Sequence, residues 1–119
     1  FTLVHDDIMD DDLLLHGQPT VQKKWDNATA ILAGDGLFVE AQRAITRVRN
    51  NAQRVYTVFN DGALAVCVGQ AYDKEYEENQ TITLSDYLHM TEKKTGAMLS
   101  LCMEIPALLA TRMKWYAVN

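Results

Sequence analysis

The sequence lacks several features that would place it outside the cell, in a membrane or on a nucleic acid. It has only two cysteines, Cys67 and Cys102, and both lie in apolar segments, so we expect buried free thiols and no disulfide framework. No apolar run reaches membrane-spanning length, and no secretory signal is visible. The formal net charge of −5 argues against a general nucleic-acid surface, which needs a basic stripe. Together these absences predict a cytoplasmic protein.

Internal boundaries are also missing from the chain. Its 119 residues contain no low-complexity tract and no long Ser/Gly linker, and a hydrophobic content of 48% is ordinary for a globular protein. We therefore expect one structural unit. Because the first residue is Phe1 and not a methionine, we expect the chain to begin inside a longer product.

Strand signals are weak, and helical periodicity dominates the chain. The segment TITL at 81–84 alternates poorly and is too short for a strand. The apolar periodicity predicts helices over the following ranges: 1–15, 28–48, 52–78 and 86–112. The predicted fold class is all-α, a bundle of long, mostly antiparallel helices.

Turn and cap residues set the expected ends of these helices. Gly17 and Pro19 break the first helix and predict a loop that lasts until Asn27, the expected N-cap of the next helix. Ser85 is the expected N-cap of the last helix, and Pro106 is expected to kink that helix or remove one of its hydrogen bonds. The apolar side of the second helix is predicted from these residues: Ile31, Leu32, Phe38 and Val39.

The acidic run HDDIMDDD places five aspartates between Asp6 and Asp12. Asp6 and Asp10 are four residues apart, so on a helix their carboxylates project side by side, and Asp7 and Asp11 repeat that spacing. Like charges this close repel one another unless a cation neutralises them. Mg²⁺ prefers one or two carboxylates, several waters and substrate phosphate oxygens. The run therefore predicts a magnesium site, with a solvated acidic helix end as the alternative interpretation.

Two later segments carry polar residues at helical spacing. Gln70 and Asp73 lie three residues apart in GQAYDKEYEE, which also fits a hydrophilic helix end, and the spacing does not support a second pair of metal-binding aspartates. Lys93 and Lys94 precede Thr95 within an otherwise apolar helix. Two adjacent lysines commonly form a surface pair, whereas a lysine beside a hydroxyl can hold a phosphate as a point charge.

Taken together, these stretches resemble one family. The order LVHDDIMD, GxPT, KKW, AILAGDGL, GQxxD and KT is similar to that of the trans-isoprenyl diphosphate synthases, and the resemblance spans Phe1 to about Leu109. These are all-α, Mg²⁺-dependent enzymes that make farnesyl, geranylgeranyl and longer polyprenyl diphosphates. The resemblance implies a prenyltransferase of isoprenoid biosynthesis that condenses isopentenyl diphosphate with an allylic diphosphate.

The resemblance also implies roles for particular residues. Asp6, Asp7 and Asp10 match the first aspartate-rich motif (DDxxD), which holds Mg²⁺ against the allylic diphosphate. Gln70 and Asp73 match the GQxxD pair, which lies behind this metal site in the family. Lys94 and Thr95 match the KT pair, which contacts the allylic diphosphate and stabilises the developing carbocation.

Product length is implied by the residues four and five positions before the first aspartate, here Thr2 and Phe1. Bulky residues there limit the pocket for the growing tail, and Phe1 resembles the short-chain enzymes, roughly of the geranylgeranyl class. Helix geometry places Thr2, and not Phe1, on the face of Asp6. One departure concerns the diphosphate: the family usually has Arg-Arg-Gly before Pro-Thr, where this chain has Leu15-His16-Gly17.

Family members are usually more than twice as long as this chain. Residues 1–119 are thus expected to be the central part of one isoprenoid synthase domain, inactive alone, whose long helices pack into a homodimer. Two alternatives stay open. A non-catalytic partner subunit is favoured by Leu15-His16 and opposed by the intact DDIMD. A class I terpene cyclase shares the first motif but would lack GQxxD and KT.

Overall fold

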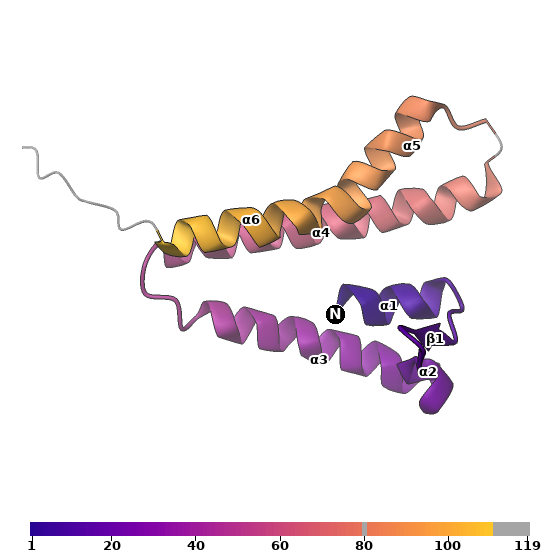
Figure 1. The fold of residues 1–119 in the computed structure, drawn as a ribbon, viewed down its shortest axis with the longest axis horizontal. Coiled ribbons are helices and arrows are strands. Elements are labelled where there is room, and N and C mark those ends of the chain that lie inside the picture. Colours follow the sequence, from indigo (N-terminus) through magenta and orange to yellow (C-terminus); the bar gives the residue numbers. More distant parts are fainter. Residues whose placement is uncertain (80, 111–119) are drawn as a thin grey trace, which may run out of the picture. The chain divides into compact units, whose positions relative to one another are not determined.

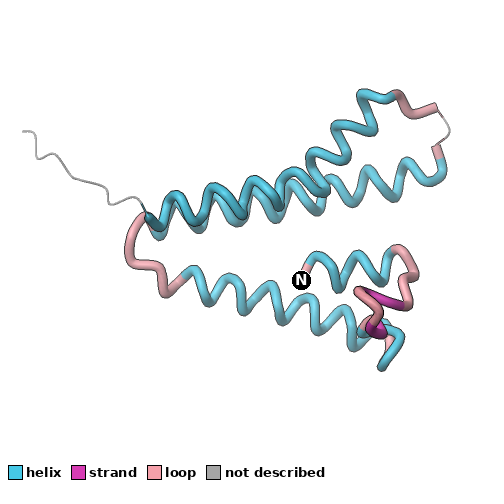
Figure 2. The backbone as a smooth tube through the Cα atoms, viewed as in Figure 1, coloured by secondary structure: helices cyan, strands magenta, loops and turns pink. Residues whose placement is uncertain are grey.

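Helices account for most of the structure, a computed structural model that describes residues 1–79 and 81–110 (Figures 1 and 2). A single two-stranded antiparallel pair interrupts the helices within the described residues. The elements in chain order are α1 (Thr2–Met9), β1 (Leu14–Leu15), β2 (Gln18–Pro19), α2 (Val21–Lys24), α3 (Asn27–Ile45), α4 (Ala52–Glu78), α5 (Leu84–Thr91), a π-helical turn (Glu92–Gly96, hereafter the π-turn) and α6 (Ala97–Ala110). The all-α prediction is confirmed.

The contacts of the chain separate into two units, Phe1–Arg47 and Val48–Asn119. No Ser/Gly-rich or Pro-rich linker marks the division, so the composition carries no signal of it.

In the first unit, α1 packs antiparallel along α3. The ring of Phe1 meets the ring of Phe38 edge to face, with 5.0 Å between their centroids. One turn further along α1, the imidazole Nε2 of His5 lies 3.2 Å from the carbonyl oxygen of Ile31. Gly34 permits this approach, because a Cβ at that position would overlap the His5 ring.

The first helix ends much earlier than the expected residue 15. Met9 is its last residue, Asp10 caps it, and Asp11 adopts a left-handed φ of 54°. Continuing the helix would place further carboxylates beside one another at a helix C-terminus, where both the neighbouring charges and the macrodipole oppose them.

The segment 16–27, expected to be a loop, contains regular structure. β1 and β2 pair through the two-residue turn His16-Gly17, in register Leu15↔Gln18. His16 has φ 50° and Gly17 has φ 78°, and positive φ at both central residues is typical of the type I′ turn that fits strand twist. The short helix α2 follows at once. Two-residue strands carry no alternation from which a sequence pattern could predict them.

The predicted details of α3 are partly wrong. Its N-cap is Asp26, whose carboxylate accepts from the Thr29 amide at 2.6 Å, and not Asn27, and the helix ends at Ile45 and not at residue 48. The apolar side predicted for α3 is not its buried side: Phe38 is half-buried, whereas Ile31, Leu32 and Val39 are exposed. The buried residues of α3 are Ala30, Gly34 and Ile45.

In the second unit, α4 and α6 lie side by side and antiparallel (Figure 1). The Asn51 side-chain amide, just before α4, donates to the carbonyl oxygen of Leu108 near the end of α6, at 2.7 Å. Midway along the pair, Gly62 faces Leu101, whose methyl carbons would lie 2.6 Å from an added Cβ. The predicted bounds of α4, 52–78, are confirmed.

The last predicted helix, 86–112, is divided into α5, the π-turn and α6, and residues 111 and 112 lie outside the described residues. Its N-cap is Thr83 and not Ser85, because Thr83 and Asp86 form a capping box. The Thr83 hydroxyl accepts from the Asp86 amide, and the Asp86 carboxylate accepts from the Thr83 amide at 2.8 Å. Pro106 lies inside α6, which continues through it without the hydrogen bond that a proline cannot donate.

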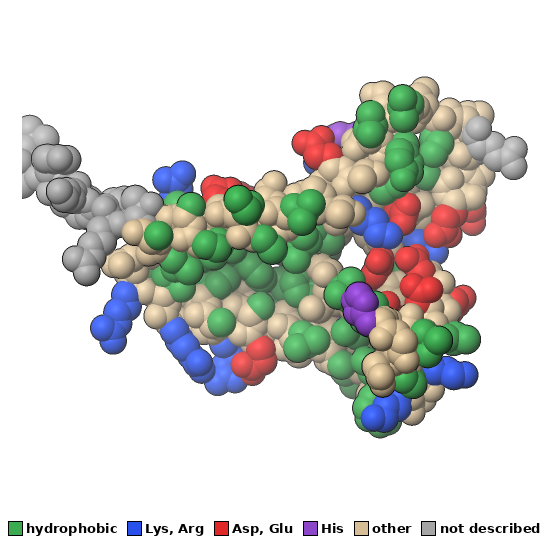
Figure 3. All heavy atoms as spheres, viewed as in Figure 1, with side chains coloured by type: hydrophobic (Ala, Val, Ile, Leu, Met, Phe, Trp, Pro, Cys, Tyr) green, Lys and Arg blue, Asp and Glu red, His purple; other side chains and the backbone are tan. Residues whose placement is uncertain are grey.

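Large apolar side chains remain exposed on both units. Figure 3 shows hydrophobic side chains gathered along α4 and α6, and those exposed there include Leu64, Leu99 and Met103. Cys67 and Cys102 are free, as expected, but they are exposed and not buried. None of the helices in the described part of the chain is long and apolar enough to span a membrane.

Candidate active site

The acidic run HDDIMDDD lies at the C-terminal end of α1. Asp6 and Asp7 belong to the helix, and Asp10 is its C-cap. The Asp10 amide donates to the carbonyl oxygen of Asp6 at 2.9 Å, so helical hydrogen bonding continues one residue past Met9. Asp6 and Asp10 are therefore held one helical turn apart, which is the spacing that the sequence predicts.

Asp7 is the buried member of this run, with 6% of its surface exposed. Burial raises the pKa of its carboxyl group above the usual value, and the carboxylates of Asp12, Asp6 and Asp10 raise that pKa further. A carboxylate whose charge is disfavoured in this way gains stability when a cation comes close.

The loop after Asp10 is fixed by two polar side chains that the sequence analysis did not single out. The Gln22 side-chain amide donates to the carbonyl oxygens of Asp7 and Asp12, at 2.8 and 2.7 Å. The hydroxyl of the buried Thr20 also donates to the Asp12 carbonyl oxygen, at 2.8 Å. The signal that could have found Thr20 is the Pro-Thr pair of GQPT, which follows the acidic run closely in sequence.

Magnesium is the ion that the sequence implies for this run. Within residues 1–79 and 81–110, no three His, Cys, Asp or Glu side chains converge to hold a metal ion by protein ligands alone. Mg²⁺ commonly takes only one or two carboxylates, with waters and substrate phosphates completing its shell. The carboxylates of Asp6 and Asp10 lie one helical turn apart, next to Asp7, whose negative charge is unfavourable in the folded chain. They fit this small number of protein ligands.

Phe1 and Thr2 stand at the other end of α1. Thr2 is the first residue of the helix and lies one turn before Asp6 on the same side, whereas Phe1 is the N-cap. The Phe1 ring instead packs against Phe38 of α3. An aromatic pair therefore forms beside the start of the helix that carries the acids. The sequence predicts Phe38 only on an apolar face and does not indicate that Phe1 is its partner.

The second unit brings together Asp73 of α4 and Lys94 of the π-turn. The Lys94 ammonium donates to Asp73 Oδ2 at 2.7 Å, and both side chains are largely buried, with 21% and 27% of their surfaces exposed. Thr95 follows Lys94 in the π-turn and is exposed. Gln70 carries a buried side-chain nitrogen that has no hydrogen-bond partner in the described part of the chain.

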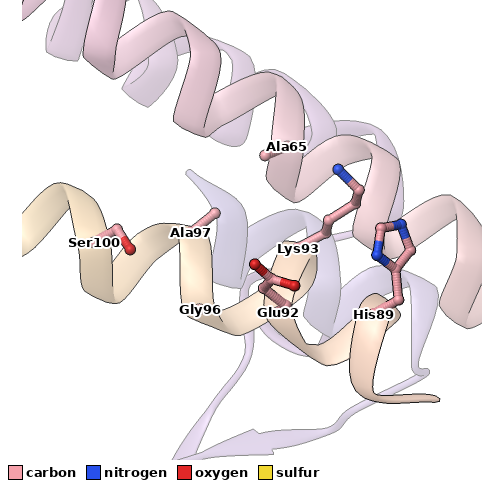
Figure 4. Close-up of a pocket in the computed structure, with 7 residues that line it drawn as sticks. All are labelled: Ala65, His89, Glu92, Lys93, Gly96, Ala97 and Ser100. Carbon is pink, nitrogen blue, oxygen red and sulfur yellow. The ribbon is translucent and has the colours of Figure 1, made fainter. Parts of the chain in front are cut away.

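A shallow pocket of about 260 Å³ lies on the second unit, beside the π-turn (Figure 4). Lys93 extends past Ala65 of α4, and the side chains of His89 and Glu92 stand next to it. None of the residues predicted for the active site lines this pocket.

The predicted site residues therefore fall into two groups. The first unit holds Phe1, Thr2, Asp6, Asp7 and Asp10, whereas Gln70, Asp73, Lys94 and Thr95 belong to the second. Within each group the residues are neighbours along one helix or, for Asp73 and Lys94, across an ion pair.

Comparison with known proteins gives the family. Residues 1–117 match the family described as "Polyprenyl synthetase". The chain belongs to the polyprenyl synthetase family.

Relatives in this family include archaeal enzymes. The chain is 42% identical over 112 residues to a geranylgeranyl diphosphate synthase of Methanosarcina mazei, covering 92% of this chain and 35% of that protein. It is 43% identical over 112 residues to a short chain isoprenyl diphosphate synthase of Methanocaldococcus jannaschii, covering 92% of this chain and 34% of that protein. The chain thus spans about a third of the length of the relatives that it matches.

Solved structures of polyprenyl synthetase relatives share the fold. A geranylgeranyl pyrophosphate synthetase from Pyrococcus horikoshii superposes with a TM-score of 0.88 at 39% identity, covering 92% of this chain and 35% of that one. A polyprenyl synthetase from Streptomyces coelicolor superposes with a TM-score of 0.85 at 34% identity, covering 91% and 32%.

The hairpin between the acidic run and α2 departs from the pattern that the resemblance implies. Leu15 ends β1 and His16 occupies the left-handed turn, at the two positions where the resemblance leads us to expect arginines. An apolar side chain cannot contact a diphosphate as an arginine does, and a histidine supplies at best a partial charge.

Proposed function

We propose that the protein containing this chain is a prenyltransferase that condenses isopentenyl diphosphate with an allylic diphosphate in isoprenoid biosynthesis. The observation that carries this proposal is the pair Asp6 and Asp10, held one turn apart beside the buried Asp7 in a member of the polyprenyl synthetase family. Residues 1–119 would form the central part of one isoprenoid synthase domain. The chain order of its motifs, DDxxD, then GQxxD, then KT, supports that assignment.

Asp6, Asp7 and Asp10 would hold Mg²⁺ together with the allylic diphosphate. When bound, the ion neutralises the diphosphate charge that develops as the allylic C–O bond ionises. Lys94 would bind the same leaving group as a point charge, and Thr95 would orient it with its hydroxyl. Asp73 keeps the Lys94 ammonium in place through their ion pair, and Gln70 would donate to a ligand oxygen.

The double bond of isopentenyl diphosphate then attacks the allylic carbocation, and a proton leaves the new carbocation to give the longer diphosphate. Water would end the reaction if it reached the cation, so the tail must sit between apolar walls. We assign Phe1 and Phe38 to the wall at the start of α1, with Thr2 beside it, and expect short products of about the geranylgeranyl class. The names of the relatives given above are compatible with that length.

The experiment is prenyl transfer by the full-length protein with and without Mg²⁺, compared with its Asp6→Ala variant. We expect radiolabelled isopentenyl diphosphate to enter products only with Mg²⁺ and only in the wild-type protein. Equal incorporation by the variant would refute the assignment of Asp6. Size-exclusion chromatography with light scattering on the same sample tests the homodimer that we also propose, and fractionation of the source cells tests a cytoplasmic location.

A second candidate is a non-catalytic partner subunit of such a synthase, and Leu15-His16 is the observation that favours it. The two candidates differ in ligand binding. A catalytic protein should be stabilised against heat by a diphosphate in the presence of Mg²⁺, whereas a scaffold subunit should not respond.

A further inference from the structure

The feature that carries a further inference is the crossing of α4 and the π-turn at Gly69. Gly69 is buried. A Cβ added there would overlap the backbone nitrogen of Lys94 and would lie 2.7 Å from the backbone carbonyl carbon of Lys93. Because these are backbone atoms inside a packed core, they cannot rotate away as the end of a side chain can. The two helices therefore touch backbone to backbone, and only glycine fits at this point.

Other glycines of the chain provide a contrast. A Cβ at Gly62 would meet only the side chain of Leu101, 2.6 Å away, which has other rotamers. At Gly96, within the π-turn itself, an added Cβ would find its nearest neighbour at 3.7 Å, an ordinary contact. Among the described glycines, Gly69 alone would bring an added Cβ within 3.0 Å of backbone atoms.

The same crossing fixes the starting point of the Lys94 side chain. Asp73 lies four residues after Gly69 and thus one turn further along the same side of α4. The Lys94 backbone rests on Gly69, and its ammonium reaches Asp73 Oδ2 at 2.7 Å. The contact occurs within the π-turn, where the helix departs from α geometry, and such insertions are frequent at functional sites.

We propose that Gly69 is a positioning residue for Lys94: by letting the π-turn backbone touch α4, it sets the point from which the Lys94 ammonium reaches Asp73. The importance of this for catalysis rests on the proposed function, in which Lys94 binds a leaving diphosphate. The placement of Lys94 can be measured without any catalysis.

The first test uses lysine signals of the full-length protein without substrate. Reductive methylation with ¹³C-formaldehyde keeps the charge of each lysine and gives it an NMR signal, and the Lys94 signal is the one lost in Lys94→Arg. Asp73→Asn defines the shift that follows when the ion pair is broken. We expect Gly69→Ala to move the Lys94 signal in that same direction, and Gly62→Ala and Gly96→Ala to leave it in place. An unmoved signal in Gly69→Ala overturns the proposal.

The second test separates positioning from general packing by a double-mutant cycle on kcat. We expect Gly69→Ala to lower kcat by about 10- to 100-fold, the size of effect known for small displacements of reacting groups. In the Lys94→Met background the same substitution should cost much less, because it acts through Lys94. Equal losses in both backgrounds overturn the proposal. A wild-type protein without prenyl transfer would refute the proposed function alone, and the lysine signal would still decide this inference.

A folding defect in Gly69→Ala is covered by a second variant. Ala65→Gly combined with Gly69→Ala moves the glycine by one turn on the same side of α4 and keeps the composition. If this variant folds, we expect a displaced Lys94 signal, and a signal at the wild-type position overturns the proposal. If both Gly69 variants fail to fold while Gly62→Ala folds, the proposal is also overturned, because Gly69 then serves packing in general.

Discussion

Asp7 is a carboxylate that the fold buries beside three others, so its charge is disfavoured in the folded chain. The raised pKa means that the folded chain holds a proton at Asp7 more tightly than the unfolded chain does. Between the unfolded value near 3.9 and the raised folded value, the free energy of unfolding therefore falls as the pH rises, and it stays lower at neutral pH. A residue that opposes folding at pH 7 calls for a role in binding.

The first prediction is that Asp7→Asn raises the free energy of unfolding at pH 7 in the absence of Mg²⁺. The gain over the wild-type protein should shrink toward zero as the pH falls below about 4, because Asp7 is then protonated in both states. Urea unfolding at both pH values measures it. A variant that is less stable at pH 7 would contradict the prediction. In the same variant, Mg²⁺ and a diphosphate should no longer raise the free energy of unfolding, so the substitution would increase stability and reduce ligand binding.

The second prediction compares two neighbouring acids with different expected roles. Asp10→Asn should lower kcat of the full-length protein by about 100- to 1000-fold, as removal of one electrostatic contact to a transition state commonly does. Asp11→Asn is the matched control, because Asp11 is exposed with φ 54° and asparagine tolerates that left-handed conformation. Steady-state kinetics of both variants measure kcat. A similar loss of kcat in both would contradict the prediction, because it would mean that only the total negative charge of the run matters.

At the scale of elements, the helix caps and the close helix crossings organise the chain. The capping box of α5 lowers the pKa of Asp86 through its hydrogen bonds with Thr83. A lowered pKa contributes stability that is present above the unfolded value near 3.9 and is lost as the pH falls through the folded value.

The third prediction follows from this capping box. Thr83→Ala should lower the free energy of unfolding by about 1 kcal/mol at pH 7, the usual cost of losing an N-cap side chain. Ser85→Ala, two residues away on the exposed first turn, should change it by less than about 0.5 kcal/mol. Denaturant unfolding of both variants checks this. The opposite order would restore Ser85 as the cap.

The fourth prediction uses two glycines of α3. Gly34→Ala should destabilise the chain by about 1–3 kcal/mol, because the new methyl group overlaps the His5 ring and must push α1 away. Gly36→Ala finds no atom within 4 Å of the added Cβ and should stabilise the helix by about 0.5–1 kcal/mol. Thermal unfolding of the two variants measures the difference, and equal effects would contradict the packing described for α1 and α3.

The sequence predicts the long elements well and their ends poorly. The 27 residues of α4 are predicted at both ends, because their apolar periodicity is long and Asn51 marks the turn before them. The π-turn has no such signal. Its residues, EKKTG, continue a helical pattern, and its backbone meets Gly69, which lies 25 positions earlier in the chain than Lys94.

In the candidate site, too, the sequence predicts local spacing but not contacts between distant segments. The spacing of Asp6 and Asp10 is local, so the sequence alone predicts that they lie one turn apart. The ion pair of Asp73 and Lys94 joins two helices, and nothing in either segment alone indicates which carboxylate the lysine meets. The sequence does not indicate the burial of Asp7 either, because Gln22, which donates to the Asp7 carbonyl oxygen, comes from the far side of the hairpin.

At the scale of the whole molecule, the exposed apolar surface is the main feature. Leu32, Leu64, Leu99 and Met103 each expose more than 60% of their surfaces in the 119-residue chain. Large apolar side chains exposed to this extent usually lie against another chain segment or subunit.

The fifth prediction is that residues 1–119, produced alone, have no prenyl transfer activity and bind a hydrophobic fluorescent dye strongly. The full-length protein should show activity with Mg²⁺ and at least about fivefold weaker dye fluorescence per mole, because the same apolar faces are then covered. Activity of the 119-residue chain equal to that of the full-length protein would refute the assignment of this chain to the central part of a larger domain.

The division of the chain into Phe1–Arg47 and Val48–Asn119 also bears on how the protein is made. Every contact inside the first unit joins residues that are synthesised, and emerge from the ribosome, ahead of the residues of the second unit. The pairing of α1 with α3, including the aromatic contact of Phe1 and Phe38, can therefore form during translation before α4, α5 and α6 are complete. The acidic motif can thus fold before the segment that carries Gln70, Asp73 and Lys94 has been completed.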